Sequence, residues 1–258
     1  DFEGTCPPFF AEDSAGTGNV WARDDYFPSV YYDLGPDHFY SANSDGDDNS
    51  NPWDTWLVSI PIYLTQAGLN DAFVSFTSYF QDYAGAGEAW FMVSNDNRAT
   101  WNTLLYLTND DNEQTYAYDL SAYVGDTIQL AWRYSDNNDG DAWSWSIDDI
   151  ALYSSNDIDI VFTELMYNSP EGGTDSLEFV EFYNNSPYPA FVEGWTYEYS
   201  GTVIHSQADS AVFDPYTYAV IAEDSTIFDN FYGIAPIQMS DPASFFGYSN
   251  SPPRSIVM

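Results

Sequence analysis

Positively charged side chains are nearly absent from this chain. Its 258 residues contain no lysine and four arginines, Arg23, Arg98, Arg133 and Arg254, against 41 acidic residues, for a formal net charge of −37. Phosphate backbones and anionic lipid surfaces bind through cationic partners. The sequence therefore argues against nucleic-acid and membrane-surface binding. It favours metal cations or high salt as partners, because mobile ions must screen carboxylates that have few internal counter-charges.

Cysteine and long apolar runs are also scarce. Cys6 is the single cysteine and cannot form an internal disulfide, and no basic residue beside it in sequence lowers the pKa of its thiol. No apolar run approaches the ~20 residues that cross a bilayer, so membrane insertion is not expected. The sequence has no signal peptide, so if the chain is secreted, we expect Asp1 to be a processed or arbitrarily chosen start.

The usual parts of hydrolytic active sites are missing. The two histidines are His38 and His205, and neither a G-x-S-x-G nor an H-E-x-x-H motif occurs. A pair of catalytic carboxylates that hydrolyses glycosides remains an alternative, but among 41 acidic residues a pair that is close in sequence carries little information. We predict that the protein is not an enzyme.

Aromatic residues, in contrast, are abundant. Nine Trp, 22 Tyr and 18 Phe in a chain that is 44% hydrophobic predict a folded core despite the charge. Alternating apolar and polar residues favour strands over helices, and residues 1–55 are expected to hold little regular structure. The absence of helical crossovers predicts an antiparallel sandwich. Its strands are expected at 56–64, 72–80, 88–94, 103–107, 115–120, 127–135 and 142–153.

The last of these segments places a carboxylate on an aromatic face. With period two, Trp143, Trp145, Ile147 and Asp149 share one face of a strand, which we interpret as the core face. A lone carboxylate is costly to desolvate. We therefore expect Asp149 to be hydrogen-bonded, paired or bound to a cation.

Four segments in order, 56–62, 91–96, 118–128 and 140–153, resemble the MAM-like jelly rolls, which include the cleaved-adhesin domains of secreted bacterial proteins. The resemblance covers residues 1–155 and implies an extracellular, usually non-catalytic and often calcium-binding module. In MAM-like domains a cation can tie the N-terminal acidic motif to the core sheets. The resemblance thus implies a structural Ca²⁺ bound by Glu3, Asp25, Asp54 and Asp149, while the acidic loops 45–48 and 136–141 stay open as solvated surface or further sites.

A second β-domain is expected at residues 156–258. Segments 160–168, 178–184 and 192–195 resemble the lamin-tail domain, an immunoglobulin-like sandwich. Residues 248–258 lie where such domains still have strands to come, so we expect C-terminal strands to be missing. Either sequence beyond Met258 supplies them, which we prefer, or another chain donates a strand to the open edge.

Other candidate sites rest on single residue types. Loop aromatic residues could stack on the apolar face of a sugar, although packing in the core is the alternative for each: Tyr31, Tyr32, Tyr40, Trp53 and Tyr188. Five hydroxyl residues that follow an aspartate resemble the short sites of bacterial O-glycosylation: Ser14, Thr127, Ser176, Ser210 and Ser225. Asn184 starts an N-linked glycosylation pattern, and unmodified surface is the alternative for all six.

These observations predict two β-sandwiches in a secreted or surface-exposed, non-catalytic module for adhesion or extracellular structure, stabilised by calcium. Its partner would be an extracellular glycan or protein, or copies of itself that pair through an open sheet edge into a fibre or sheath. The alternative hypothesis is a carbohydrate-binding accessory module of a larger secreted hydrolase.

Overall fold

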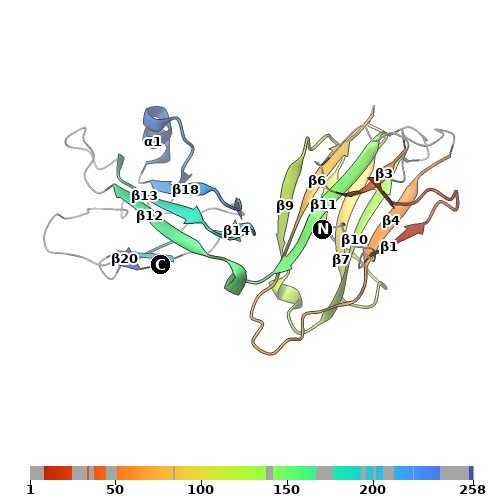
Figure 1. Ribbon diagram of the computed structural model, residues 1–258, viewed down its shortest axis with the longest axis horizontal. Helices are drawn as coiled ribbons and strands as arrows, with labels where there is room; N and C mark the ends of the chain where they lie inside the picture. The colour runs from red at the N-terminus through yellow and green to blue at the C-terminus, as the bar shows by residue number, and fades with distance from the viewer. Residues whose placement is uncertain are drawn as a thin grey trace, which may run out of the picture. The chain divides into compact units, whose positions relative to one another are not determined.

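The chain forms two compact units, unit 1 (Asp1–Ser154) and unit 2 (Ser155–Met258), in the computed structural model (Figure 1). The structure describes residues 9–24, 34, 38–44, 51–83, 85–137, 142–166, 177–192, 212–222 and 224–236 in full, and the backbone of 196–199, 202–205, 237–238 and 256–257. None of the helices in these ranges is long and apolar enough to cross a membrane.

Unit 1 is built from a 6-stranded and a 5-stranded sheet. The first has the order β1 (Phe9–Asp13), β4 (Asp54–Ser59), β10 (Thr127–Ser135), β7 (Glu88–Ser94), β8 (Asn102–Leu107), with β5 (Ile62–Tyr63) also paired to β10. The second has the order β2 (Ala22–Arg23), β3 (Tyr40–Asn43), β11 (Ser144–Tyr153), β6 (Phe73–Gln81), β9 (Gln114–Asp119). All pairings are antiparallel, and most connections pass from one sheet to the other, which gives an antiparallel β-sandwich of the expected all-β class.

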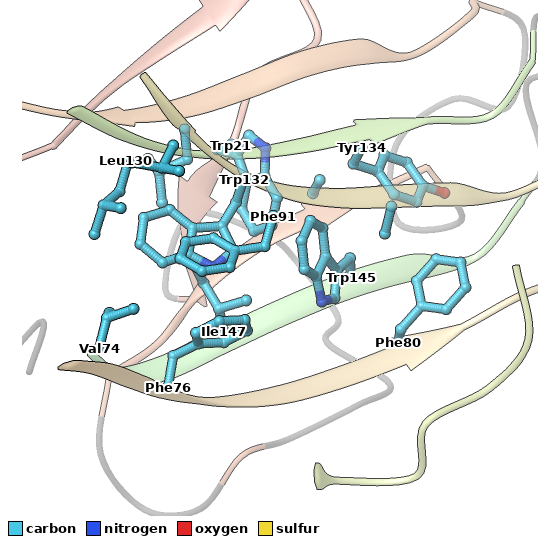
Figure 2. Close-up of a cluster of buried hydrophobic side chains, with 14 of the residues drawn as sticks. Trp21, Val74, Phe76, Phe80, Phe91, Leu130, Trp132, Tyr134, Trp145 and Ile147 are labelled. Atoms are coloured by element: carbon cyan, nitrogen blue, oxygen red, sulfur yellow. The ribbon is translucent and has the colours of Figure 1, made fainter. Parts of the chain in front are cut away.

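Alternation along the strands builds the core of unit 1. In β10, Ile128, Leu130 and Trp132 point into the sandwich, and Val74 and Phe76 of β6 meet them from the other sheet (Figure 2). The core rings pack closely, with centroids 4.8 Å apart for Phe76 and Phe91 and 5.5 Å apart for Phe76 and Trp132. Each fully buried aromatic side chain of this kind stabilises the fold by about 1.5–3 kcal/mol.

Strand β11 departs from the predicted alternation at a β-bulge. Trp145 and Ile147 are fully buried, but the pairing with β6 shifts between Asp148 and Ala151, where Asp149 has φ 52°. This β-bulge turns Asp149 to the surface, whereas Ile150 packs against the core. The prediction that Asp149 ends the core face is therefore wrong.

The first 55 residues also contribute more to the sandwich than predicted. Strand β1 pairs with β4 along its whole length, and β3 pairs with β11 through Ser144–Asn43 to Ile147–Tyr40. Buried Trp21 packs edge-on against Trp145, with ring centroids 5.4 Å apart. These strands were not predicted from the sequence because each strand is short and is flanked by turn-forming residues such as glycine and aspartate.

The described part of unit 2 comprises three small sheets and an α-helix. The 4-stranded sheet has the order β12 (Ile160–Met166), β13 (Phe179–Asn184), β18 (Tyr218–Ala222), β19 (Ile237–Gln238). The others are β14 (Ala190–Phe191) with β17 (Val212–Phe213), and β16 (Thr202–His205), β15 (Thr196–Tyr199), β20 (Ile256–Val257) in that order. Strands β18 and β19 are parallel and are connected through α1 (Ser225–Tyr232).

Helix α1 was not expected from the sequence, although its end signals are present. The Asp224 carboxylate accepts a hydrogen bond from Ile227 N at the N-terminus, and Gly233 adopts a left-handed conformation at the C-terminus, with φ 70°. Phe228 is the buried anchor of the helix, and its ring packs on Phe179 of β13 at 5.3 Å. The helix thus covers part of the sheet through this aromatic contact.

Candidate functional site

A row of side chains crosses the outer side of the 6-stranded sheet in unit 1. The strand register places Arg133 of β10 beside Trp56 of β4 on one side and beside Trp90 of β7 on the other, and Trp90 beside Tyr106 of β8. Their chain neighbours Leu57, Phe91 and Trp132 are in the core, so the row faces outward. We call Trp56, Trp90, Trp101, Tyr106 and Arg133 the aromatic face.

Arg133 is the centre of this row. Its guanidinium lies 4.6 Å from the ring centre of Trp90 and 5.3 Å from that of Trp56, and it donates two hydrogen bonds to Asp54, from Nε at 2.8 Å and from Nη2 at 2.9 Å. The hydrogen bonds to Asp54 raise the pKa of Arg133 above its ordinary value. The pair of rings and the carboxylate hold the guanidinium in one orientation.

Tyr106 presents the most open ring of the face. It stacks on Trp90 with centroids 5.3 Å apart and planes inclined by 22°, yet 50% of the residue is exposed. The hydroxyl donates to the Glu88 carboxylate, and this hydrogen bond raises the pKa of Tyr106. One side of the ring is therefore fixed by Trp90, and the hydroxyl by Glu88, while the other side meets solvent.

The loop between β7 and β8 lies over the neighbouring part of the sheet. Trp101 reaches Trp56, with centroids 5.7 Å apart, and Arg98 forms an ion pair with Glu12 of β1 while its guanidinium lies 5.4 Å from the Phe10 ring. Beneath the three indoles of the aromatic face lies a small apolar cluster on the outer side of the sheet: Val58, Met92 and Ala131, all buried. The loop thus shields that part of the sheet and places a third indole in the aromatic face.

Asp96 organises this loop. Its carboxylate accepts hydrogen bonds from Thr100 N at 2.9 Å, Thr100 Oγ1 at 2.6 Å and Ser94 Oγ at 2.8 Å. Hydrogen bonding from Thr100 lowers the pKa of Asp96 from 3.8 to about 2. The ionised carboxylate therefore fixes the turn that carries Arg98 and Trp101.

The predicted calcium ligands do not come together among the described residues. Glu3 and Asp25 lie outside them, Asp54 is held by both nitrogens of the Arg133 fork, and Asp149 is exposed on the bulge of β11. Within the part of the chain that the structure describes, no group of three or more His, Cys, Asp or Glu side chains could hold a metal ion. The calcium site stays a prediction.

None of the predicted sugar-stacking residues is a member of the aromatic face. Tyr31 and Tyr32 are outside the described residues, and Trp53, only 3% exposed, packs in the core against Tyr134 with centroids 6.4 Å apart. Tyr40 is half-buried in β3 and packs against the core. Tyr188 of unit 2 is half-buried, and its carbonyl accepts a hydrogen bond from the Asn184 amide. Trp53 in particular cannot stack on a sugar without leaving the core.

The predicted glycosylation sites differ in exposure. Ser14 and Thr127 are exposed, Ser225 is half-buried as the first residue of α1, and Ser176 and Ser210 lie outside the described residues. Asn184 is fully buried, and its amide nitrogen donates to the carbonyls of Tyr188, Phe213 and Asp214. That nitrogen is where an N-linked glycan would attach, so the folded structure contradicts this prediction.

Sequence reasoning missed the aromatic face because its members come from four separate segments. The available signal was local: in β7, Trp90 and Met92 alternate with Phe91 and Val93, so both sides of the strand carry large apolar residues. Such a strand is either covered on both sides or presents aromatic residues to solvent. Only the register shows which residues of β4, β8 and β10 lie beside it.

No protein-family model matches the chain, and no curated protein matches it. Solved structures that resemble it include two cleaved adhesin domains of Lys-gingipain from Porphyromonas gingivalis W83. The K3 domain is 17% identical with a TM-score of 0.42, over 58% of this chain and 93% of that one. The K1 domain is 16% identical with a TM-score of 0.40, over 58% and 92%.

A family 11 carbohydrate-binding module from Clostridium thermocellum, in complex with a β-1,3-1,4-mixed-linked tetrasaccharide, also resembles the chain. It is 15% identical with a TM-score of 0.35, over 60% of this chain and 92% of that one. Likeness at this distance assigns neither a family nor a function to the chain. The lamin-tail resemblance of unit 2 stays a prediction.

Proposed function

We propose that unit 1 is a non-catalytic module that binds a neutral glycan outside the cell, and that the aromatic face is its binding surface. The observation that carries the proposal is the exposed ring of Tyr106, held flat on Trp90 beside the Glu88 carboxylate. A sugar ring has an apolar side that stacks on such a platform and hydroxyls that donate to adjacent carboxylates. Adhesion to a polysaccharide would follow from this binding.

The charges of the face favour a neutral ligand over an anionic one. Arg133 is paired with Asp54, and Arg98 with Glu12, so neither guanidinium is left without a carboxylate. Glu88 adds a further acidic group beside Tyr106. Because the whole chain carries a net charge of −37, uronate or sulfate groups would be repelled, whereas hydroxyl groups would find acceptors.

The experiment is affinity electrophoresis of the full chain through gels that contain neutral β-glucan, galactan or mannan, with polygalacturonate as the anionic comparison. The wild type should be retarded by a neutral polysaccharide and not by polygalacturonate. Tyr106→Ala should weaken that binding about tenfold, the equivalent of one lost stacking contact. Tyr63→Ala, at a residue 65% exposed in β5, is the matched control and should bind like the wild type. Retardation by none of the neutral polysaccharides would contradict the proposal.

Self-association is the second candidate function, and one observation in unit 2 favours it. Among the described strands, β12 lies at the end of its sheet, with Val161 40% and Phe162 45% exposed. Such an edge can pair with a strand of another copy. Light scattering after size-exclusion chromatography should then detect assemblies that are lost in Phe162→Asp but kept in Tyr216→Asp. A monomer at every concentration would rule this out.

Calcium belongs to the proposal as a structural ion of unit 1. The excess of 41 acidic over four basic residues supports it, because a bound cation relieves repulsion among carboxylates. Calcium at about 100 times its dissociation constant should raise the melting temperature by roughly 5 °C or more over the value in EDTA. Equal melting temperatures with calcium and with EDTA would remove calcium from the proposal.

A further inference from the structure

Trp143 adopts a backbone conformation that bulky residues rarely take. Its φ is 61°, in the left-handed region, and the residue is half-buried, whereas Trp145 two positions later is fully buried. Regular alternation would have placed both indoles in the core. The left-handed turn instead moves the first one to the rim of the sandwich. A strained conformation of this kind persists only where the surrounding structure fixes it.

Buried hydrogen bonds fix the backbone around Trp143. The Trp143 carbonyl accepts from Ser44 N and from Ser44 Oγ, both at 2.8 Å, and the Ala142 carbonyl accepts from the Tyr134 hydroxyl at 3.0 Å. Ala142 N in turn donates to Ser44 Oγ at 3.1 Å. Ser44 and Tyr134 are fully buried, so solvent does not compete for these bonds. The position of the indole is therefore set by the core.

Tyr83, the ring partner of Trp143, belongs to a turn that is fixed by hydrogen bonds. The rings lie 5.6 Å apart with planes inclined by 31°, and Tyr83 is 49% exposed. Beside it, the Asp82 carboxylate accepts hydrogen bonds from Gly85 N at 2.7 Å and Gly87 N at 2.6 Å. A Cβ on Gly87 would come within 3.2 Å of the Ala142 carbonyl, so this turn lies directly against the segment that carries Trp143.

Tyr83 lies where β6 of the 5-stranded sheet connects to β7 of the 6-stranded sheet, and Trp143 directly precedes β11. Gly87 leads directly into Glu88, which starts β7 and accepts the Tyr106 hydroxyl. At the same end, Ser135 of β10 is paired with Glu88, and Asn137 donates from its side chain to the Ala86 carbonyl at 3.1 Å. A chain of sugars stacked on Tyr106 and extended past Glu88 would thus meet the rim where Tyr83 and Trp143 lie.

We propose that Tyr83 and Trp143 form a second aromatic subsite, which takes a further sugar ring of the same neutral glycan. The inference rests on the proposed function of the aromatic face. Acidic groups lie on the turn that carries Tyr83, since Asp82 precedes it and donates from its backbone to the exposed Asp110 carboxylate at 2.9 Å, and Glu88 follows the turn. Carboxylates accept hydrogen bonds from hydroxyls and repel anions, which fits an uncharged sugar. Because the two rings already pack on each other, stacking on a ligand costs them little conformational entropy.

The test uses isothermal titration of the full chain with a neutral polysaccharide that retards the wild type and with its short oligosaccharides. Tyr83→Ala should weaken polysaccharide binding about fivefold or more, the effect of one lost stacking contact, and leave a di- or trisaccharide on Tyr106 unaffected. Trp143→Gly should show the same loss, because glycine accepts the left-handed conformation and keeps the fold. Tyr63→Ala is again the exposed control.

The outcomes separate the two proposals. If Tyr106→Ala loses affinity while Tyr83→Ala and Trp143→Gly bind the polysaccharide like the wild type, the second subsite is wrong and the aromatic face stands. If the wild type binds no neutral polysaccharide, both proposals are wrong. Loss of polysaccharide affinity in Tyr83→Ala and in Trp143→Gly, with oligosaccharide binding kept, supports the second subsite.

Discussion

Trp132 and Arg133 are neighbours in β10, and they lie on opposite faces of the 6-stranded sheet. Trp132 is fully buried in the core, and the ring of Phe91 lies 4.8 Å and that of Phe76 5.5 Å from its ring (Figure 2). Arg133 lies between two indoles and is paired with Asp54. One face of the sheet thus packs aromatic residues with each other, and the other face packs them with charged groups.

This difference teaches how to interpret a chain with 19% aromatic residues. The count alone indicates a core, because most aromatic residues are buried. The surroundings of each ring decide the rest. In the core, the indole Nε1 of Trp132 has no hydrogen-bond partner among the described residues. On the aromatic face, Glu88 accepts from Tyr106 and Asp54 from Arg133, whose guanidinium lies against Trp56 and Trp90, so polar groups adjoin these three rings.

The largest expected effect comes from removing a ring on the inner face. Trp132→Ala should lower the free energy of unfolding by about 3–5 kcal/mol, because it removes buried contacts and leaves a cavity. Trp90→Ala, at a half-buried residue of the outer face, should cost about 1–2 kcal/mol from lost burial. Urea denaturation followed by circular dichroism measures both. Equal losses would mean that the two faces do not differ as the packing indicates.

Arg133 offers the next largest effect. Arg133→Lys keeps the charge but loses the two-pronged contact with Asp54 and the planar stacking between Trp56 and Trp90. We expect a loss of about 1–2 kcal/mol in unfolding free energy and weaker glycan binding. Arg23→Lys in β2 is the control for an arginine of the other sheet. If Arg133→Lys matched the wild type in both measurements, the orientation of the guanidinium would not matter.

The sequence predicted the regular strands well and the irregular positions poorly. Strands β7 and β10 begin and end at the predicted residues, because alternation and turn residues mark both ends. The bulge at Asp149 and the left-handed turn at Trp143 reverse side chains that alternation assigns to the core. Both depend on contacts from other strands, such as the bonds from Ser44 to Trp143, which no local pattern reveals.

The candidate site was less predictable than the fold. Trp56, Trp90, Tyr106 and Arg133 come from different strands, and their proximity follows only from the order β4, β10, β7, β8 and its register. The sequence instead predicted that aromatic residues in loops stack on a sugar, and one of these, Trp53, is in the core. The physical reason is that a sheet surface brings distant segments together, whereas loop composition is a local property.

The stability of the core and of the loop on the outer face should depend on pH in opposite ways, because two aspartates have pKa values that are shifted in opposite directions. Asp111 is partly buried at the edge of the core, where its carboxylate accepts from Ser78 Oγ, which itself accepts from the indole of Trp145. Burial raises the pKa of Asp111 above 3.8, although hydrogen bonds from Ser78 and Phe80 oppose the shift. A raised folded-state pKa stabilises the protein at low pH, and that contribution is lost as pH rises through the folded pKa.

Asp111→Asn should therefore gain stability relative to the wild type as the pH rises from about 3 to 7, since the neutral amide has no charge to desolvate. The amide oxygen can still accept from Phe80 N. Melting temperatures of the two proteins across this range measure the difference. The opposite trend, with Asp111→Asn falling behind the wild type at neutral pH, would show that hydrogen bonding to the carboxylate outweighs its burial.

Asp96 on the loop above the outer face should show the reverse dependence and the smallest effect. Its folded-state pKa of about 2 lies below the ordinary 3.8 because Thr100 and Ser94 donate to the ionised carboxylate. Its contribution is present above the ordinary pKa and is lost as pH falls through about 2. Acid should therefore loosen the turn that carries Arg98 and Trp101 before it unfolds the sandwich.

Hydrogen exchange at the amide of Thr100, which donates to Asp96, should accelerate relative to core amides as the pH falls from 4 to 2 and should already be fast in Asp96→Ala. Asp119→Ala, which removes a carboxylate that accepts from Ser121 N in another turn, should leave the Thr100 amide protected. Protection of Thr100 that persists at pH 2 or in Asp96→Ala would mean that the contacts of Trp101 and Arg98 with the sheet hold the loop without the carboxylate.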